Sequence, residues 1–236
     1  MSVAILMPVH NEGERLIQTL ASLRARAHRF GAVTVFLVDD GGEPAISLAE
    51  LPRANEAFDI VLARHAVNLG QGAALETARQ LALRHSPFDA YITMDSDGQH
   101  GATSALSLAQ AIIEGADVAL GNRFKGGSDV PAHRRWLLQA ACFLEWAITG
   151  IRLSDAHNGL RGFSHRALAG IRIRQNRMAH ATEIRMSISR APHWRVVEVP
   201  VSIQYTAECL AKGQRATSAL TIVQDLLSQY LFGDSR

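Results

Sequence analysis

The sequence predicts a single α/β domain in which helices flank a mostly parallel sheet. Short apolar runs alternate with longer amphipathic runs, a pattern typical of strand–helix–strand units with right-handed crossovers. Acidic or polar residues follow several of the apolar runs. The 236 residues contain no internal repeat, low-complexity stretch or linker, and this length suffices for one domain with a sizeable core.

The first half of the chain supplies most of the expected strands. Apolar or β-branched runs predict strands at residues 3–9, 33–38, 60–63, 90–94 and 118–120. Amphipathic runs predict helices at residues 14–29, 73–84 and 102–114. In sheets of this kind a ligand binds beyond the carboxyl ends of the strands, so polar residues at those ends mark the expected site.

The rhythm changes after Gly121. The second half predicts a long apolar helix at 134–151, a glycine-containing turn region at 159–163, a helix at 181–190, a strand at 196–205 and a C-terminal helix at 216–231. These elements are expected to pack against the same sheet, because nothing in the sequence marks a second domain.

Composition narrows the function classes. The formal net charge is only +2, which argues against a protein that binds nucleic acid by bulk charge. Cys142 and Cys209 are far apart in sequence and predict reduced thiols in a cytosolic protein. The amino terminus shows no secretory signal, and no uninterrupted apolar run reaches the roughly 18 residues of a membrane span. We therefore expect a soluble or peripheral protein.

Asp95 and Asp97 directly follow the predicted strand at 90–94. Residues two apart in extended backbone face the same side, so these carboxylates form a hard oxygen site suited to Mg²⁺ or Mn²⁺. A metal there would bridge a diphosphate and neutralise charge on a leaving nucleoside diphosphate. Gln99 could add a ligand. A polar turn with helix-capping aspartates is the alternative, and an Asp-x-Asp pattern alone does not separate the two.

Two further segments have the composition of a nucleotide site. Asp39 and Asp40 end the strand at 33–38 and precede two glycines, so a carboxylate could accept from a base N–H or a ribose hydroxyl at close approach. Gly70 and Gly72 stand at a helix start, where backbone N–H groups suit phosphate or ribose. Each segment alone also fits a structural turn.

Taken together and in order, the motifs are far more specific. The chain contains PVHNE, VDDGG, NLGQGAA, MDSDGQH and GNRF, and it resembles the family 2 glycosyltransferases, most of all the dolichyl/polyprenyl-phosphate sugar synthase group. DAHNGLRGF resembles that group's Asp-x-x-x-Gly-Phe-Arg region, and EVPVSIQYTAECLAKGQ its Glu-x-Pro-Val…Tyr…Lys-Gly segment. The resemblance implies a GT-A, Rossmann-like fold, with 1–121 as the nucleotide-sugar half and 122–236 as the acceptor half.

The resemblance also implies a role for each matching residue. The residues expected at the nucleotide are Pro8, His10, Asn11, Glu12, Asp39, Asp40, Gly70, Gln71 and Asp95. Asp95, Asp97 and Gln99 would hold Mg²⁺ or Mn²⁺. Arg123, with Arg134 or Arg135, would meet an acceptor phosphate, Lys212 would close over the donor diphosphate, and Asp155 would lie near the reacting centre.

Departures from the group bear on the donor. His10 stands where Tyr is common and Gly42 where Ser is common, so both GDP- and UDP-sugars stay open as donors. The Gln-x-x-Arg-Trp motif of processive members is absent, as are the usual C-terminal transmembrane helices, and we expect a single sugar transfer rather than polymerisation.

The resemblance implies inverting transfer to a polyprenyl phosphate at the inner face of the membrane. Such an acceptor is already an oxyanion, so the protein must align two anions rather than supply a strong base. Arg134 and Arg135 precede Trp136 at the start of the long apolar run, which fits a phosphate clamp beside an interfacial helix or, equally, a buried core helix. A small membrane-protein partner and a homo-oligomer stay open, and no nucleic acid is expected.

Other functions stay open. Transfer to a hydroxyl of a lipid-linked glycan would need a carboxylate base, for which Asp155 is the candidate. A sugar nucleotidyltransferase also binds nucleotide on an α/β sheet, but it usually has Arg and Lys in an N-terminal glycine-rich loop, where this chain has Glu12 and Glu14. The intact Asp95 and Asp97 speak against a non-catalytic nucleotide-sugar-binding protein.

Overall fold

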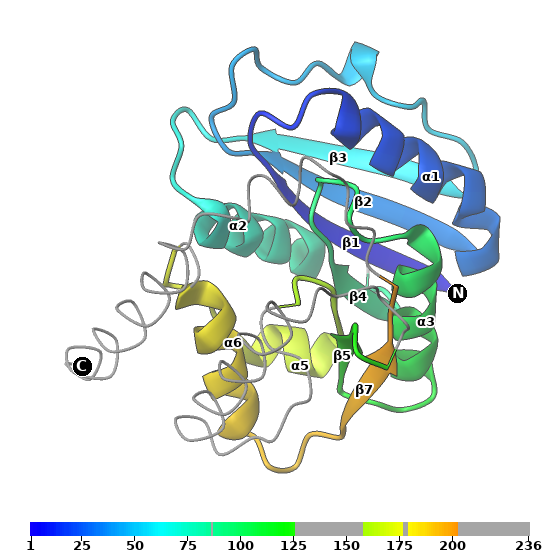
Figure 1. Cartoon of the computed structure of the whole chain (residues 1–236), viewed down its shortest axis with the longest axis vertical. Helices are drawn as coiled ribbons and strands as arrows, with labels where there is room; N and C mark the ends of the chain where they lie inside the picture. The colour runs from blue at the N-terminus through cyan, green and yellow to red at the C-terminus, as the bar shows by residue number, and fades with distance from the viewer. Residues whose placement is uncertain (86, 126–157, 177–178, 203–236) are drawn as a thin grey trace.

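A computed structural model of the chain describes residues 1–85, 87–125, 158–176 and 179–202 (Figure 1). The predicted helices at 134–151 and 216–231 lie outside these residues. So do four of the predicted site residues, which are Arg134, Arg135, Asp155 and Lys212.

Within the described ranges, seven strands form one sheet in the order β3-β2-β1-β4-β6-β5-β7. Their bounds are β1 Ser2–Val9, β2 Ala32–Asp39, β3 Phe58–Arg64, β4 Ala90–Thr93, β5 Val118–Asn122, β6 Arg161–Phe163 and β7 Val196–Pro200. All of them run in one direction except β6, which is antiparallel to both of its neighbours. The predicted α/β fold with a mostly parallel sheet is therefore confirmed.

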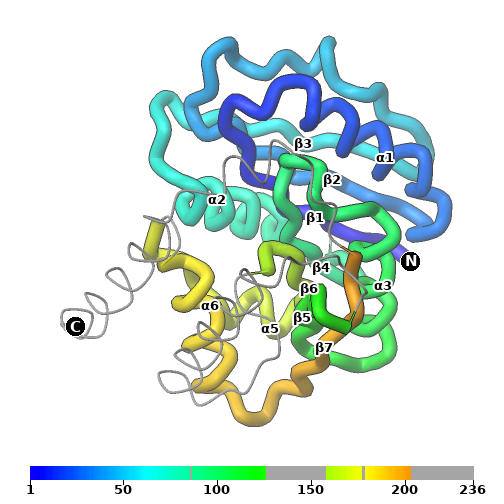
Figure 2. The backbone as a smooth tube through the Cα atoms, in the orientation of Figure 1, coloured from blue at the N-terminus to red at the C-terminus, as the bar shows by residue number. Residues whose placement is uncertain are grey.

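Helices cover both faces of the sheet (Figure 2). On one face lie α1 (Glu14–Phe30) and α3 (Ala102–Ile113); on the other lie α2 (Gln71–Arg84), α5 (His165–Gly170) and α6 (Ala179–Ser189). Alternate residues of β1 serve the two cores, so this strand is apolar along nearly its whole length. A stripe of alanines at Ala74, Ala78 and Ala82 faces the sheet, where small side chains let α2 pack close to Phe36 and Tyr91.

The prediction of a turn region at 159–163 is wrong, because Arg161–Phe163 form β6. This short strand inserts between β4 and β5 and pairs with both. Gly162 fits the tight space, since a Cβ there would lie 3.2–3.3 Å from side-chain atoms of Ile92, Ala119 and Ile112. A three-residue strand gives too little alternation to be recognised from sequence. The predicted strand at 196–205 also ends early, at Pro200.

One edge of the sheet collects the polar segments. The parallel strands β1, β2, β4 and β5 all end there, and β6 begins there, with Arg161 opposite Thr93 and Leu120. The strand order reverses between β1 and β4, and doubly wound sheets bind ligands at such a reversal. The fold therefore predicts a ligand site at the loops after β1, β2 and β4.

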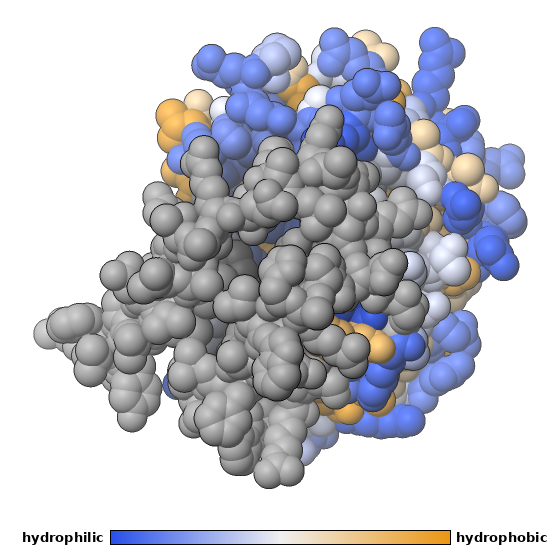
Figure 3. All heavy atoms as spheres, viewed as in Figure 1, coloured by the Kyte–Doolittle hydropathy of each residue, from blue (hydrophilic) through white to orange (hydrophobic). Residues whose placement is uncertain are grey.

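The surface over α1 and the loops beside it is mostly hydrophilic, with a small hydrophobic group over the β3–α2 loop, where Val67 and Leu69 are exposed (Figure 3). Among the described helices, none is both long and apolar enough to cross a bilayer.

An ion pair on α2 joins the two halves of the chain. Arg79 donates two hydrogen bonds of 2.7 Å to the carboxylate of Glu76 and a third, of 3.2 Å, to the carbonyl of Leu168 at the end of α5. Glu76 also accepts from the backbone N–H of Ile173. Burial alone would raise the pKa of Glu76, but the hydrogen bonds from Arg79, Gln80 and Ile173 hold it below its ordinary value.

We predict that Glu76→Gln destabilises the protein by about 1–3 kcal/mol at neutral pH, because charge-assisted hydrogen bonds are lost. The lowered pKa means that the contribution of Glu76 is complete above its ordinary value of 4.5 and is lost as the pH falls through the folded-state value. Chemical denaturation from pH 6 down to about pH 3 should therefore show wild type and variant converging at low pH. The surface variant Glu56→Gln is the control, and an equal effect of both substitutions at all pH values would contradict the assignment.

Candidate functional site

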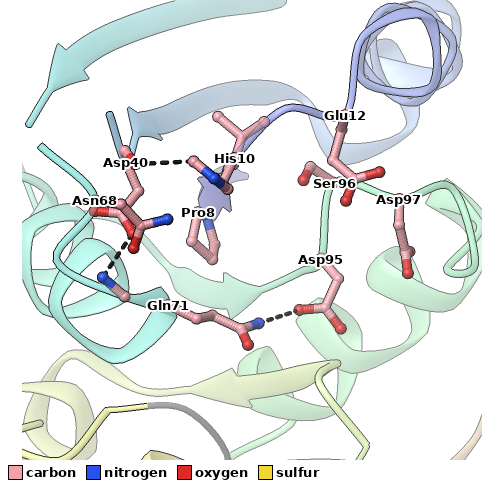
Figure 4. A pocket seen from close by; sticks show the side chains of 11 residues that line it. Pro8, His10, Glu12, Asp40, Asn68, Gln71, Asp95, Ser96 and Asp97 are labelled. Carbon is pink, nitrogen blue, oxygen red and sulfur yellow. Dashed lines mark hydrogen bonds between the residues drawn. The ribbon is translucent and has the colours of Figure 1, made fainter. Parts of the chain in front are cut away.

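A cavity of about 440 Å³ opens at the carboxyl ends of β1, β2 and β4 (Figure 4). It is lined by Pro8, Val9, His10, Glu12, Asp40, Asn68, Gly70, Gln71, Asp95, Ser96 and Asp97. All of these except Val9, Asn68 and Ser96 are residues that the sequence predicts at the nucleotide or the metal. The volume lies in the range of small-molecule and cofactor sites.

Asp95 is the carboxylate at the centre of this edge. Gln71 donates to its Oδ1 at 3.0 Å across the cavity, and His100 Nε2 lies 3.6 Å from its Oδ2. Burial raises the pKa of Asp95, but the contact with His100 and the electrostatic attraction of His100, Arg161 and His180 outweigh it and keep the pKa below its ordinary value. Asp95 is therefore ionised at neutral pH.

Gly159 leaves room for this carboxylate. A Cβ at Gly159 would fall 2.1 Å from Asp95 Oδ2, a distance that would force the side chain away. The carbonyl of Gly159 in turn accepts from Thr93 Oγ1 at 2.8 Å. The Asn-Gly-Leu segment that leads into β6 thus packs directly against the acidic end of β4.

Asp97 lies on the same side of the cavity as Asp95 (Figure 4). Its carboxylate accepts from the backbone N–H of Gln99 at 3.0 Å and from the Gln99 side-chain amide. Gln99 does not line the cavity in this arrangement, and its role as a metal ligand stays a prediction.

The two adjacent aspartates at the end of β2 have different surroundings. Asp40 lines the cavity, whereas Asp39 accepts from the backbone N–H of Gly42 at 2.8 Å and of Ile46 at 3.2 Å and lies 3.6 Å from Arg64 Nε. Asp39 borders a neighbouring cavity of about 370 Å³ together with Asn11, whose Oδ1 accepts from the N–H of Glu43. In this structure, Asp39 and Asn11 thus fix the loop after β2 and do not border the larger cavity.

His10 is held at the cavity wall by its ring nitrogens. Nδ1 lies 3.0 Å from the carbonyl oxygen of Asp40, which can only accept, so Nδ1 is the protonated nitrogen. Nε2 is then free to accept from the Asn11 amide, 3.4 Å away. The imidazole is therefore a flat ring of fixed orientation at the position where an aromatic residue is common in the group that the sequence resembles.

The glycines at the start of α2, Gly70 and Gly72, lie next to residues 175–176 of the second half of the chain. Asn176 accepts from the N–H of Ala73 at 2.9 Å and donates to the carbonyl of Leu69 at 2.6 Å. A Cβ at Gly72 would lie 2.1 Å from the carbonyl oxygen of Gln175. Here Gly72 lets a segment of the second half of the chain approach, while Gly70 lines the cavity.

Arg123 is buried immediately after β5 and is not among the residues that line the cavity.

Three residues contribute to the site although the sequence motifs assign them no role. His65 contacts Asp40, and Arg161 and His180 lie near Asp95. For Arg161 a signal exists, because Asp155 to Arg161 reads Asp-x-x-x-Gly-Leu-Arg, with Leu160 in place of Phe.

A doubly wound sheet with a polar cavity at its reversal point is typical of α/β proteins that bind nucleotides. Within that class the chain belongs to glycosyl transferase family 2, whose profile matches residues 4–172. The chain is therefore an enzyme, a family 2 glycosyltransferase, rather than a nucleotidyltransferase or a non-catalytic binding protein.

Among the proteins that match nearly the whole chain are relatives with assigned functions. The UDP-N-acetylglucosamine–dolichyl-phosphate N-acetylglucosaminyltransferase of Methanococcus voltae is 24% identical over 95% of this chain and 94% of its own length. The dolichol-phosphate mannosyltransferase of Pyrococcus furiosus is 23% identical over 98% of this chain and 63% of its own length.

A solved structure shares the fold. Glucosyl-3-phosphoglycerate synthase from Mycobacterium tuberculosis, in complex with Mn²⁺ and UDP-glucose, has a TM-score of 0.65 over 97% of this chain and 78% of its own, at 14% identity. The likeness confirms the predicted GT-A fold.

We predict that Gly72→Ala destabilises the protein by about 1–3 kcal/mol, because the new methyl group meets the backbone of Gln175. Alanine would otherwise favour this helical position by about 1 kcal/mol, so a net loss shows that the contact dominates. Gly101→Ala is the control, since a Cβ there meets nothing within 4 Å, and its effect should stay under about 1 kcal/mol. Thermal denaturation measures both, and a stabilised Gly72→Ala protein would refute the close contact.

Proposed function

We propose that the protein transfers one sugar from a GDP- or UDP-sugar to a polyprenyl phosphate, with inversion at the anomeric carbon and with Mg²⁺ or Mn²⁺ bound. The observation that carries the donor side is the single cavity bordered by the ends of β1, β2 and β4, with Asp95 and Asp97 at one side and His10 and Asp40 at the other. The nucleoside would lie against His10 and Asp40, and the diphosphate would reach toward the two carboxylates.

The available carboxylates fit a divalent metal that is bound jointly by the protein and by the diphosphate of the nucleotide sugar. Among the described residues, no group of three or more His, Cys, Asp or Glu side chains could hold a metal alone. Mg²⁺ is usually bound by one or two carboxylates together with substrate phosphates, and Asp95 and Asp97 supply such a pair. When bound, the metal would neutralise charge on the leaving nucleoside diphosphate.

The relatives support the lipid acceptor, because two of them are named for transfer to dolichyl or dolichol phosphate. Arg123, with Arg134 or Arg135, is the proposed contact of the acceptor phosphate, and Lys212 of the donor diphosphate. Such an acceptor would place the enzyme peripherally at the inner face of the membrane. Transfer to a hydroxyl of a lipid-linked glycan remains the second candidate, with Asp155 as its base.

Asp97→Asn tests the metal site. We expect sugar transfer to fall at least about a hundredfold, because one charged ligand of the metal is removed at the point where charge develops. The assay follows release of nucleoside diphosphate from UDP- and GDP-sugars, with Mn²⁺ and a short polyprenyl phosphate. The surface variant Asp59→Asn should stay active, and near-normal, metal-independent activity of Asp97→Asn would rule out the assignment.

Arg123→Ala and Asp155→Asn together test the acceptor class. With a phosphate acceptor, Arg123→Ala should lower turnover at least about tenfold, about 1.4 kcal/mol, while donor binding changes little and Asp155→Asn has the smaller effect. Because Arg123 is buried, thermal denaturation must first show that the variant folds. An inactive Asp155→Asn beside a nearly normal Arg123→Ala would instead favour the hydroxyl acceptor.

A further inference from the structure

The loop between β3 and α2 is tied to the carboxylate of Asp40. Oδ1 accepts from the backbone N–H of Leu69 at 2.9 Å, and Oδ2 accepts from the N–H of Gly70 at 2.7 Å. His65 Nδ1 approaches Oδ1 at 2.7 Å, and the Asp40 side chain is only 3% exposed. A buried carboxylate needs such donors, and here two of the three come from the loop that borders the cavity.

His65 connects this carboxylate to α2. The carboxylate can only accept, so Nδ1 donates to Asp40, and Nε2 lies 2.9 Å from Thr77 Oγ1 on α2. The backbone N–H of His65 also donates to the carbonyl of Asp39 at 2.8 Å. The imidazole is thereby held from both ends, between the end of β2 and the second turn of α2.

The order carboxylate–imidazole–hydroxyl is also that of a nucleophilic triad. Thr77, however, does not line the cavity, so its hydroxyl has no route to a bound substrate there. The arrangement instead fixes geometry: His65 orients Asp40, and Asp40 orients the loop.

The loop also links Asp40 to Asp95, on the far side of the cavity. Directly after Gly70 comes Gln71, whose side chain reaches across and donates to Asp95 Oδ1 at 3.0 Å (Figure 4). Asn68, Gly70 and Gln71 all line the cavity. A displacement of the loop would therefore change both the wall beside Asp40 and the contact made by Asp95.

We propose that His65 is a positioning residue for the donor, which acts through Asp40 to hold the loop of residues 66–71 in the conformation that binds the nucleotide. This inference rests on the proposed function for the identity of the ligand, but not for the existence of the connection between His65 and the loop. Burial raises the pKa of Asp40, but hydrogen bonds from His65, Leu69 and Gly70 keep it below its ordinary value, so the carboxylate stays an acceptor at neutral pH.

Hydrogen–deuterium exchange without any nucleotide tests the connection itself. In His65→Leu, amides of the segment 66–71 should exchange about tenfold faster, since a hydrogen bond to a charged group that orders the loop is lost. His65→Asn, which keeps an amide N–H near the position of Nδ1, should restore exchange to within about threefold of wild type. The matched control is His165→Leu on α5, which removes a 2.8 Å hydrogen bond between His165 Nδ1 and Tyr91 Oη of β4, two residues that do not line the cavity.

Nucleotide binding tests the positioning role. With Mn²⁺ present, the Kd of UDP or GDP, whichever binds wild type, should rise about tenfold in His65→Leu and recover in His65→Asn. The KM for the nucleotide sugar should rise in parallel while kcat stays within about twofold, because a merely destabilised protein loses active molecules rather than donor affinity. His165→Leu should leave both constants unchanged.

The outcomes separate the two proposals. Unchanged exchange at 66–71 in His65→Leu overturns the connection, and faster exchange with unchanged nucleotide affinity overturns the positioning role. A wild-type protein that binds neither UDP nor GDP overturns the proposed function and the donor part of this inference, while the exchange rates still decide whether His65 holds the loop.

Discussion

The cavity depends most on how the Asp40 carboxylate is satisfied. A charge buried at the end of a strand is strongly unfavourable unless donors surround it. Here the donors are His65 and two backbone N–H groups of the β3–α2 loop. The same loop places Gln71 against Asp95. The Asp40 carboxylate therefore fixes how the parts of the cavity wall from β2, α2 and β4 lie relative to one another. The geometry of the cavity therefore follows from the need to surround the buried Asp40 carboxylate with hydrogen-bond donors.

The sequence was sufficient for the parallel strands and for most of the residues that line the cavity, because both follow from local patterns. Continuous apolar runs predict buried parallel strands, and polar residues after them must meet at one edge. The different surroundings of Asp39 and Asp40 follow from strand geometry, since adjacent residues face opposite sides of a sheet. Which of the two would border the cavity depends on which side carries α1 and which carries α2, and no local pattern states that.

Other features were hidden because they depend on contacts between distant segments. Gly72 fits a phosphate-binding loop equally well in sequence, and only the approach of Gln175 shows what it accommodates here. Arg161 lies near Asp95 because β6 runs against its neighbours and so begins at the edge where β4 ends. The Asp95 carboxylate thereby acquires a guanidinium neighbour, which favours its ionised form.

The antiparallel insertion of β6 has a consequence for how the family could recombine. Residue 121 looks like a natural boundary between a donor half and an acceptor half, yet β6 belongs to the second half and pairs with β4 and β5 of the first. A chimera spliced at that boundary would be joined near the end of β5 and would combine β6 from one parent with neighbours from another. Gly162, packed against Ile92 and Ala119, would then have to fit a foreign surface. A division of the sequence near residue 121 is therefore not a division of the folded core.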